Sequence, residues 1–377
     1  MMKPKFSLKD RLFNREKVEY LAGLILDVFP EFNKSQFIEV VVDKFPELEL
    51  KQRISWIRES LFEMLPDPYE SAVEILVKSL PPENDPELED NDFGDFIFAP
   101  YGEYVAVYGC TQDRLELSFK ALHEITRRFS AEDAIRYFIN AFEDETFEKL
   151  EQWCSDKNYH VRRLCSEGTR AKLPWCQSIK SSYNRPLVIL DRLFSDKTRY
   201  VTRSVANHMN DISKIDPTLV ISTLTRWEQS GRQSRSEMNF VIRHSLRTLI
   251  KQGHQGALKM MGYHDDPKIQ IIRFELTSET LQLGDVLEFE VEIEASENEK
   301  LLIDYRIYFE SSNSKERMKV FKLKQVELTS GKSFLFKKKH PLRADMSTFR
   351  IYPGKHAVVL QVNGRDYGLR EFDIMPV

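Results

Sequence analysis

The sequence predicts a mostly α-helical chain, a solenoid of paired-helix repeats followed by an all-β sandwich. Three observations carry this prediction. A phrase recurs at an interval of 40 residues, helical periodicity continues to about Gly262, and a period-two alternation replaces it after Asp266-Pro267. We therefore expect a helical domain at residues 1–265 and a β domain at residues 268–377.

The repeat lies in the middle of the chain. Aligning residues 153–173 with 193–213 pairs Ser155 with Ser195, Asp156 with Asp196, Lys157 with Lys197, Val161 with Val201 and Arg163 with Arg203. A further step of 40 residues reaches Val241 and Arg243. This period is typical of paired-helix HEAT-like repeats.

Apolar residues at helical spacing predict the individual helices. Within the repeat they predict an outer helix at 186–196 and an inner helix at 199–212; upstream, they predict helices at 18–29, 51–65, 69–80 and 113–129. Ser130 is expected to cap a helix over 130–142, which places Glu132 in its first turn. The acidic, proline-bearing stretch 81–102 is expected to be a loop.

After Pro267, apolar and polar residues alternate as in β-strands. The pattern predicts strands over 285–295, 301–310 and 356–364, with turns at Ser330-Gly331 and Pro353-Gly354. About 110 residues of short strands is the size of an immunoglobulin-like sandwich.

The net charge of −4 conceals a strong internal imbalance. Residues 1–152 hold 18 Lys and Arg against 32 Asp and Glu, whereas residues 153–253 hold 18 against 8, a balance of +10. Such a basic block is typical of a surface that binds a polyanion. The alternative is a solvated basic face that pairs with the acidic N-terminal third.

The composition, 41% hydrophobic and 30% charged, is that of a soluble globular protein. No apolar run reaches the roughly 18 residues of a membrane span, and the first residues lack a signal core, so we expect a cytoplasmic location. Cys110, Cys154, Cys165 and Cys176 are interpreted as reduced thiols. The chain has no CxxC, GxGxxG, P-loop or HExxH motif, so we expect no metal and no cofactor.

The inner helix that begins near His160 has two distinct faces. Its apolar stripe is Val161, Leu164 and Cys165, and a second face carries Arg163, Glu167 and Arg170. The repeated arginines Arg163, Arg203 and Arg243 would form a ladder along the concave surface, where guanidinium groups suit phosphates. Alternatively, Arg and Asp at fixed repeat positions bridge neighbouring repeats.

Two glutamates and a tryptophan suit the hydrolysis of a cationic nucleoside. Cleavage of a glycosidic bond develops positive charge on the sugar, which fixed carboxylates such as Glu132 and Glu167 would stabilise. The indole of Trp175 would attract a cationic base. The alternatives are a helix-end role for Glu132 and core packing for Trp175. Glu124 and Asp156 remain alternatives for the residue that orients the water.

The motifs HVRRLCSEGTRAKLPW, EITRRFSAEDAIRYF, YVTRSVANHMNDISKIDP and VIRHSLRTLIKQGH resemble those of the HEAT-like-repeat DNA alkylation repair glycosylases. Within them the chain is similar to the AlkC branch, which carries a C-terminal immunoglobulin-like domain. The resemblance implies a monofunctional glycosylase that removes 3-methyladenine and 3-methylcytosine without base flipping and needs no cofactor. It implies Glu132 and Glu167 as the catalytic carboxylates.

The resemblance also implies a partner, double-stranded DNA that contains alkylated bases. The residues expected to contact DNA or the lesion are His160, Arg162, Arg163, Arg170, Trp175, Arg203, Asn207, Arg243 and Arg247. In the terminal domain, the basic cluster of Lys337, Lys338, Lys339 and His340, with Arg350 and Lys355, is expected to touch DNA or to be solvated. We expect a monomer with no membrane and no obligatory protein partner. Two rival functions remain, a DNA clamp without chemistry and a HEAT scaffold for a protein.

Overall fold

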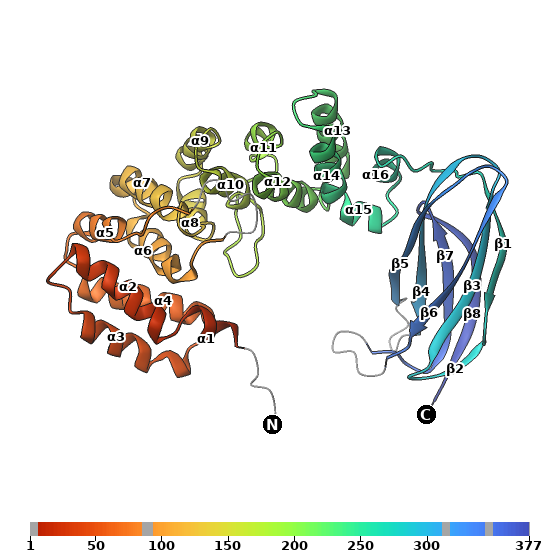
Figure 1. Cartoon of the computed structure of the whole chain (residues 1–377), viewed down its shortest axis with the longest axis horizontal. Coiled ribbons are helices and arrows are strands. Elements are labelled where there is room, and N and C mark those ends of the chain that lie inside the picture. Colours follow the sequence, from red (N-terminus) through yellow and green to blue (C-terminus); the bar gives the residue numbers. More distant parts are fainter. Residues whose placement is uncertain (1–6, 85–92, 311–316, 344–349, 377) are drawn as a thin grey trace. The chain divides into compact units, whose positions relative to one another are not determined.

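The computed structural model describes residues 7–84, 93–310, 317–343 and 350–376 (Figure 1). The chain forms two compact units. One comprises Met1–Asp211 with Ser230–Val241, and the other comprises Ile212–Gln229 with Ile242–Val377. We call them the helical unit and the sandwich unit. The predicted bounds of 1–265 and 268–377 follow the secondary structure instead, and as domain bounds they stay a prediction.

Helices fill the chain as far as Met260. Their bounds are α1 Leu8–Leu12, α2 Arg15–Val28, α3 Lys34–Asp43, α4 Leu50–Met64, α5 Tyr69–Lys78, α6 Ala99–Gly109, α7 Leu115–Thr126, α8 Ala134–Ala141, α9 Glu143–Trp153, α10 Tyr159–Glu167, α11 Leu187–Leu193, α12 Arg199–Ile212, α13 Pro217–Gln229, α14 Arg235–Ser245, α15 Arg247–Lys251 and α16 Gln255–Met260. Three 3₁₀ turns lie at Phe45–Glu47, Phe96–Phe98 and Gln112–Arg114.

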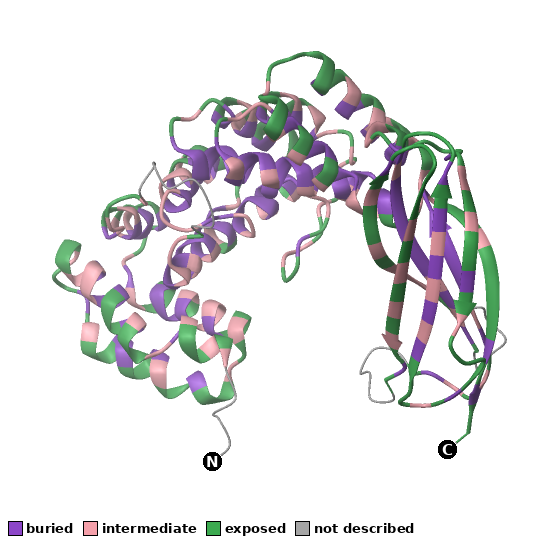
Figure 2. Ribbon diagram, turned by 45° about the vertical axis from the view of Figure 1, so that its right-hand side comes forward, coloured by how far each residue is buried: buried purple, intermediate pink, exposed green. Residues whose placement is uncertain are grey.

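Within the helical unit, successive helices alternate between two rows. In Figure 1, α7, α9 and α11 lie in one row and α8, α10 and α12 in the other. Helix α10 packs against α7, α9 and α11, so it is covered on several sides. All nine of its residues are buried, as Figure 2 shows in purple.

Two helix starts differ from the sequence prediction. The stretch 81–102, expected to be a loop, ends in a 3₁₀ turn and in α6, which begins at Ala99 with Pro100 in its first turn. Proline suits that position because the first turn needs no donor there. Helix α8 begins at Ala134, so Ser130 does not cap it and Glu132 lies in the preceding turn.

The described part of the sandwich unit contains eight strands in two sheets. They are β1 Ile269–Leu276, β2 Thr280–Gln282, β3 Val286–Ala295, β4 Glu299–Phe309, β5 Arg317–Leu328, β6 Lys332–Pro341, β7 Gly354–Val362 and β8 Arg365–Met375. One sheet has the order β1-β3-β6 and the other β2-β8-β7-β4-β5. Among the described strands, β2 and β8 pair in parallel and the other pairs are antiparallel. The three predicted strands are confirmed as β3, β4 and β7, and the turn at Ser330-Gly331 joins β5 to β6.

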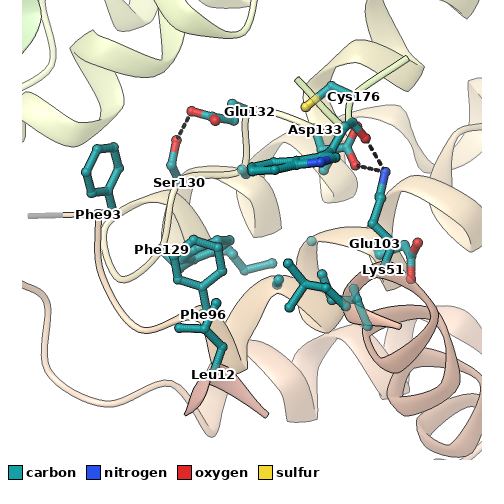
Figure 3. A pocket seen from close by; sticks show the side chains of 18 of the residues that line it. Leu12, Lys51, Phe93, Phe96, Glu103, Phe129, Ser130, Glu132, Asp133 and Cys176 are labelled. Atoms are coloured by element: carbon teal, nitrogen blue, oxygen red, sulfur yellow. Dashed lines mark hydrogen bonds and ion pairs between the residues drawn. The ribbon is translucent and has the colours of Figure 1, made fainter. Parts of the chain in front are cut away.

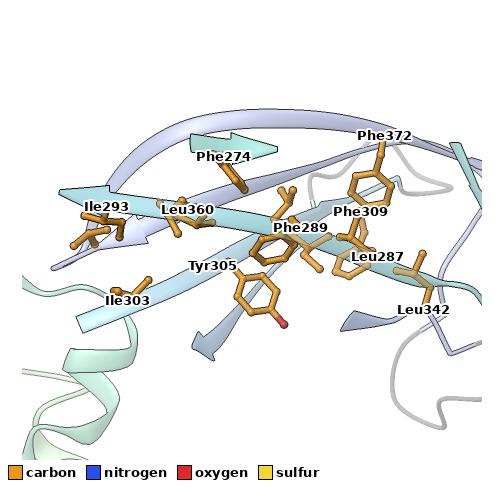
Figure 4. Packing of buried hydrophobic residues seen from close by; sticks show 14 of the residues in the cluster. Phe274, Leu287, Phe289, Ile293, Ile303, Tyr305, Phe309, Leu342, Leu360 and Phe372 are labelled. Atoms are coloured by element: carbon orange, nitrogen blue, oxygen red, sulfur yellow. The ribbon is translucent and has the colours of Figure 1, made fainter. Parts of the chain in front are cut away.

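The two sheets enclose an apolar core. Its buried aromatic residues include Phe274, Phe289, Tyr305, Phe309 and Phe372, seen in Figure 4. Alternate residues of β3 enter this core, as the period-two pattern requires.

The sandwich is joined to α16 through one buried asparagine. Asn363 has a φ of 49° and is fully buried. Its side chain accepts from Leu302 N at 2.8 Å and donates to the carbonyls of His264 at 2.9 Å and Lys300 at 3.2 Å. The segment after α16 and strand β4 are thus held by the same side chain.

Candidate active site

A cavity of about 280 Å³ opens in the helical unit (Figure 3). Its walls come from α1, α4, α6, the turn before α8 and the segment that follows α10. Its lining includes Leu8, Leu12, Leu50, Ile54, Phe93, Phe96, Phe129, Glu103, Tyr137, Ser130, Glu132, Asp133, Lys51, Trp175 and Cys176. Most of this surface is apolar, with polar groups from a few side chains, which is typical of a ligand site.

Glu132 lies at the cavity with its carboxylate held on two sides. Ser130 Oγ donates to Glu132 Oε2 at 3.1 Å, and Arg163 Nη1 donates to the same oxygen at 2.8 Å. Arg163 Nη1 also donates to Ser130 Oγ at 3.0 Å, which closes a small ring of hydrogen bonds. The Glu132 side chain remains 30% exposed, so it is oriented and still reachable by a ligand.

Glu167 ends helix α10 and is buried at 5% exposure. Arg170 Nη1 donates to its Oε1 at 2.6 Å, and Ser204 Oγ donates to its Oε2 at 2.6 Å. Burial alone would raise the pKa of Glu167, but the guanidinium groups of Arg163 and Arg170 outweigh burial and lower the pKa. Glu167 is therefore ionised at neutral pH.

Arg163 connects the two predicted catalytic glutamates. Its Nη1 bonds Glu132 and its Nη2 lies 3.6 Å from Glu167 Oε2. Burial would lower the pKa of Arg163, but the two carboxylates raise it above its usual value. The guanidinium also lies 4.7 Å from the ring centroid of Tyr200 and 5.5 Å from that of Phe93. Thus Arg163 holds both acids in a fixed relation.

The ion pairs continue to α12. Arg170 Nη2 donates to Asp211 Oδ2 at 2.6 Å. These contacts form a chain of charged side chains in which three carboxylates alternate with two guanidinium groups. Its members are, in order, Glu132, Arg163, Glu167, Arg170 and Asp211. Of these five groups Glu132 lines the cavity, so its carboxylate is the one placed to stabilise positive charge on a ligand or in a transition state.

Trp175 is the most exposed large hydrophobic side chain among the described residues, at 75%. It lines the cavity and adopts a φ of 63°, a left-handed conformation that is uncommon for a residue with a Cβ atom. Core packing, the alternative interpretation of Trp175, is therefore wrong. Its indole is free to contact a ligand.

Other predicted contacts have structural partners. Arg162 donates to Asp196 at 2.5 and 3.0 Å and to the carbonyls of Asp156 and Lys157. It joins α10 to the turn before α12, a bridge between repeats. His160 is buried against the rings of Tyr159 and Tyr200.

The remaining predicted contacts lie on later helices. Arg203 and Asn207 are half-buried on α12. Arg243 is exposed and Arg247 half-buried, and both belong to the sandwich unit. A DNA role for these residues, and for Arg162 and His160, stays a prediction.

The alternative acids lie in other local networks. Glu124 pairs with Arg127 at 2.9 Å and with Arg128 at 2.8 Å. Asp156 accepts from His123 Nε2 at 2.8 Å and from Asn158 N at 2.7 Å. Neither residue lines the cavity. Their role in orienting water stays untested.

In the terminal sandwich, the basic cluster is partly paired. Lys337 contacts Glu290 at 2.7 Å and Lys339 contacts Glu288 at 2.7 Å. His340 Nδ1 meets the Tyr305 hydroxyl at 2.8 Å, and burial lowers the pKa of His340 to about 4, so it is neutral at pH 7. Their contact with DNA stays a prediction, as it does for Arg350 and Lys355.

Sequence reasoning missed three residues at the cavity as site residues. Lys51 reaches it from α4, Asp133 follows Glu132 directly, and Phe93 borders the stretch 85–92, which lies outside the described residues. Phe93 and Lys51 lie outside the recognised motifs, so no local sequence pattern marked either of them as a site residue. Among the residues described, no group of His, Cys, Asp and Glu could hold a metal ion, and no helix is long and apolar enough to cross a membrane.

Three comparisons relate this geometry to known proteins. Residues 270–376 match the family described as "Uncharacterised protein YhaZ, C-terminal Ig-like domain". The YhaZ protein of Bacillus subtilis (strain 168) is 31% identical over 367 residues, covering 96% of this chain and 98% of that protein. Pseudomonas fluorescens alkylpurine DNA glycosylase AlkC, solved with DNA containing an abasic site analog, is 32% identical with a TM-score of 0.82, covering 98% of this chain and 100% of that one.

These likenesses span both units and confirm the predicted fold class, a helical-repeat region followed by an immunoglobulin-like sandwich. The chain belongs to the HEAT-like-repeat DNA alkylation repair glycosylases, in the AlkC branch that carries a C-terminal immunoglobulin-like domain.

Proposed function

We propose that this protein is a monofunctional DNA glycosylase that hydrolyses the N-glycosidic bond of cationic alkylated bases, 3-methyladenine and 3-methylcytosine, in double-stranded DNA. The observation that carries the proposal is one buried guanidinium, that of Arg163, which holds Glu132 at the cavity that the exposed Trp175 indole also lines, and which lies 3.6 Å from Glu167. The similar AlkC of P. fluorescens is an alkylpurine DNA glycosylase and supports the reaction class.

The chemistry follows from the charge of the lesion. A base methylated at N3 is already positively charged and leaves as a neutral molecule, so it needs no general acid. As the bond breaks, positive charge moves onto the sugar, where Glu132 stabilises it and orients the attacking water. Glu167 lies outside the cavity lining and adds a fixed negative charge behind Glu132. Its carboxylate is not easily neutralised, because its pKa is lowered.

The accessible position of the site supports catalysis without base flipping. Trp175 is largely exposed and Glu132 partly so, and both can meet a base that stays in the duplex. Base flipping normally requires a deep pocket that encloses the extruded base. A lesion-containing duplex with 2-aminopurine beside the lesion tests this point: binding should leave its fluorescence low, and a large rise would indicate unstacking.

Lys51 also supports hydrolysis rather than a lyase reaction. A lyase lysine must be neutral to attack the sugar. Burial would lower the pKa of Lys51, but its ion pair with Asp133, at 3.1 Å, outweighs burial and raises the pKa. A charged ammonium is a poor nucleophile.

The central experiment measures free base released from methylated DNA by the full-length protein. Glu132→Gln and Glu167→Gln should each reduce release by about 100-fold or more, while binding to a duplex with an abasic-site analogue persists. Glu151→Gln is the matched control, because Glu151 also pairs with two arginines, Arg185 and Arg192, and is neither a candidate acid nor part of the cavity lining. If the parent binds DNA and releases no base, the protein is a DNA clamp; if it binds no DNA at moderate salt, it is a scaffold.

A further inference from the structure

The segment that carries Trp175 has almost no regular structure of its own. Between the end of α10 at Glu167 and the start of α11 at Leu187 the chain forms only turns, bends and extended backbone. Within it Trp175 adopts the left-handed φ of 63° and exposes its indole. A bulky residue keeps such a conformation only where its surroundings determine it. The question is what holds it.

Arg136 of α8 holds the first part of this segment. Its guanidinium donates to four main-chain carbonyls, those of Gly168 at 3.1 Å, Arg170 at 2.6 Å, Ala171 at 3.0 Å and Gln177 at 2.5 Å. The side chain is fully buried. Because the four carbonyls lie on both sides of Trp175, Arg136 draws the two ends of the loop together.

Asn140, one turn further along α8, fixes the exit of the loop. Its Nδ2 donates to Ser178 O at 3.1 Å, and its Oδ1 accepts from Lys180 N at 3.0 Å. Helix α8 therefore anchors the loop at its base and leaves the tip, Pro174 and Trp175, to be held from elsewhere.

Lys51 of α4 holds the tip. Its ammonium donates to the main-chain carbonyl of Trp175 and, at 3.1 Å, to Asp133 Oδ2. Figure 3 shows the Lys51 ammonium next to Asp133 at the cavity. Lys51 and Trp175 are 124 residues apart in sequence, and Asp133 is the neighbour of Glu132. One cation thus connects the tryptophan loop to the turn that carries a predicted catalytic acid.

We propose that Lys51 is a positioning residue that fixes the Trp175 indole in relation to Glu132, with Asp133 as its counter-ion. The expected effect of Lys51 on the rate of base release rests on the proposed function. Its expected effect on the position of Trp175 does not. Lys51 touches the Trp175 backbone rather than its ring, so it acts through Trp175. Through it, α4 sets the geometry of a site whose acids come from α10 and the turn before α8.

The first test is spectroscopic and needs no substrate. The full-length protein labelled with 5-fluorotryptophan gives one ¹⁹F resonance for each of its four tryptophans, and Trp175→Phe identifies the resonance of residue 175. Lys51→Met keeps the length of the side chain and removes the ammonium. It should shift or broaden the Trp175 resonance and leave those of Trp153 and Trp227, both buried, unchanged. An unchanged Trp175 resonance overturns the proposal.

The second test is kinetic. In single-turnover release of 3-methyladenine, Lys51→Met should slow the chemical step by about tenfold to a hundredfold, with affinity for abasic-analogue DNA within about twofold of the parent. Lys51→Arg retains a donor and should recover most of the rate. Lys149→Met is the matched control, because Lys149 pairs with Glu116 at 3.2 Å outside the cavity lining, and it should behave as the parent.

The two proposals fail in different ways. If the parent releases no base but Lys51→Met moves the Trp175 resonance, the glycosylase proposal fails and the positioning role stands. If Lys51→Met lowers the melting temperature while its rate and its Trp175 resonance match the parent, Lys51 only stabilises the fold and the positioning role is rejected.

Discussion

The two units of the molecule differ in how they partner buried charge, although the sandwich unit also pairs the buried Glu299 with His264 at 2.9 Å. Around α10, the helical unit buries Arg162, Arg163 and Glu167 and gives each of them ionic partners. The sandwich core is apolar; Asp304 is buried on the other face of β4 from Ile303 and Tyr305, and its Oδ1 has no hydrogen-bond partner among the described groups. Buried ion pairs often add little net stability compared with apolar packing. Because several buried ion pairs meet around α10, we infer that this part of the helical unit is a site that needs fixed charge. The apolar core of the sandwich instead contributes to stability.

Removal of Arg163 should have the largest effect. Arg163→Met leaves Glu132 and Glu167 without their shared partner, and Glu167 is buried. We expect a loss of about 3 kcal/mol in the free energy of unfolding, because Glu132 loses its charged donor and Glu167 keeps Arg170 and Ser204 but loses Arg163. Base release should fall by at least the factor expected for Glu132→Gln. Urea denaturation and the release assay measure both effects.

Arg163→Lys separates charge from geometry, since a lysine supplies the charge but not the fork of donors. Compared with Arg163→Met, Arg163→Lys should regain more of the lost stability than of the lost rate of base release. Equal recovery of both would mean that the fork itself does not matter to the site.

Removal of the buried carboxylate of Asp304 should stabilise the protein, whereas removal of the Arg163 guanidinium should destabilise it. Burial raises its pKa from 3.8 to about 6, so the folded protein binds this proton more tightly than the unfolded chain. Stability therefore falls as pH rises from about 4 to about 6 and stays lower above that range. Asp304→Asn should stabilise the protein by about 2–3 kcal/mol at pH 8 and by almost nothing near pH 4.

Thermal unfolding between pH 4 and 8 measures this difference. The exposed Asp265→Asn is the matched control for the loss of a carboxylate at the surface. A constant difference between Asp304→Asn and the parent at every pH would contradict the assigned cause.

Phe93 should have the smallest of these effects. Its ring lies 5.5 Å from the Arg163 guanidinium and 5.8 Å from the Tyr200 ring, and the residue is 47% exposed. Phe93→Leu should cost about 0.5–1 kcal/mol of stability, the usual value of such a contact at an exposed site.

Because Phe93 lines the cavity, Phe93→Leu should also change the rate of base release. We expect base release to slow by about twofold to fivefold, since Arg163 loses one of its two aromatic neighbours. Phe62→Leu is the matched control, because Phe62 is 44% exposed and stacks on Tyr108 at 4.3 Å, away from Arg163. Equal slowing by both variants would remove Phe93 from the site.

Much of the fold could be predicted because its signals are local. The 40-residue repeat and the apolar stripes located α10, α11 and α12, and period-two alternation located β3, β4 and β7. The start of α6 was missed because an acidic, proline-bearing stretch hid it. The start of α8 was misplaced because Ser130 matches a cap, whereas it donates to Glu132 instead.

The site could be predicted only in part, because its geometry depends on contacts between distant segments. The sequence showed Glu167 among arginines, yet the single guanidinium shared with Glu132 follows from the packing of α10 on the turn before α8. Likewise the repeated Asp196 has its partner in Arg162, as the bridging interpretation expected, and nothing local indicated Lys51.

Asn363 bears on how this architecture could change in evolution. The side chain of this one residue satisfies backbone groups both in the sheet and in the connector after α16. The family match begins at residue 270, just after that connector. After a recombination event that exchanged sandwiches at the first strand, the Asn363 amide would face a connector from another chain, and it would keep this bond only if that connector brought a main-chain carbonyl to the same place. Modular exchange should be most successful when the crossover lies upstream of His264, so that the connector and the sandwich come from the same chain.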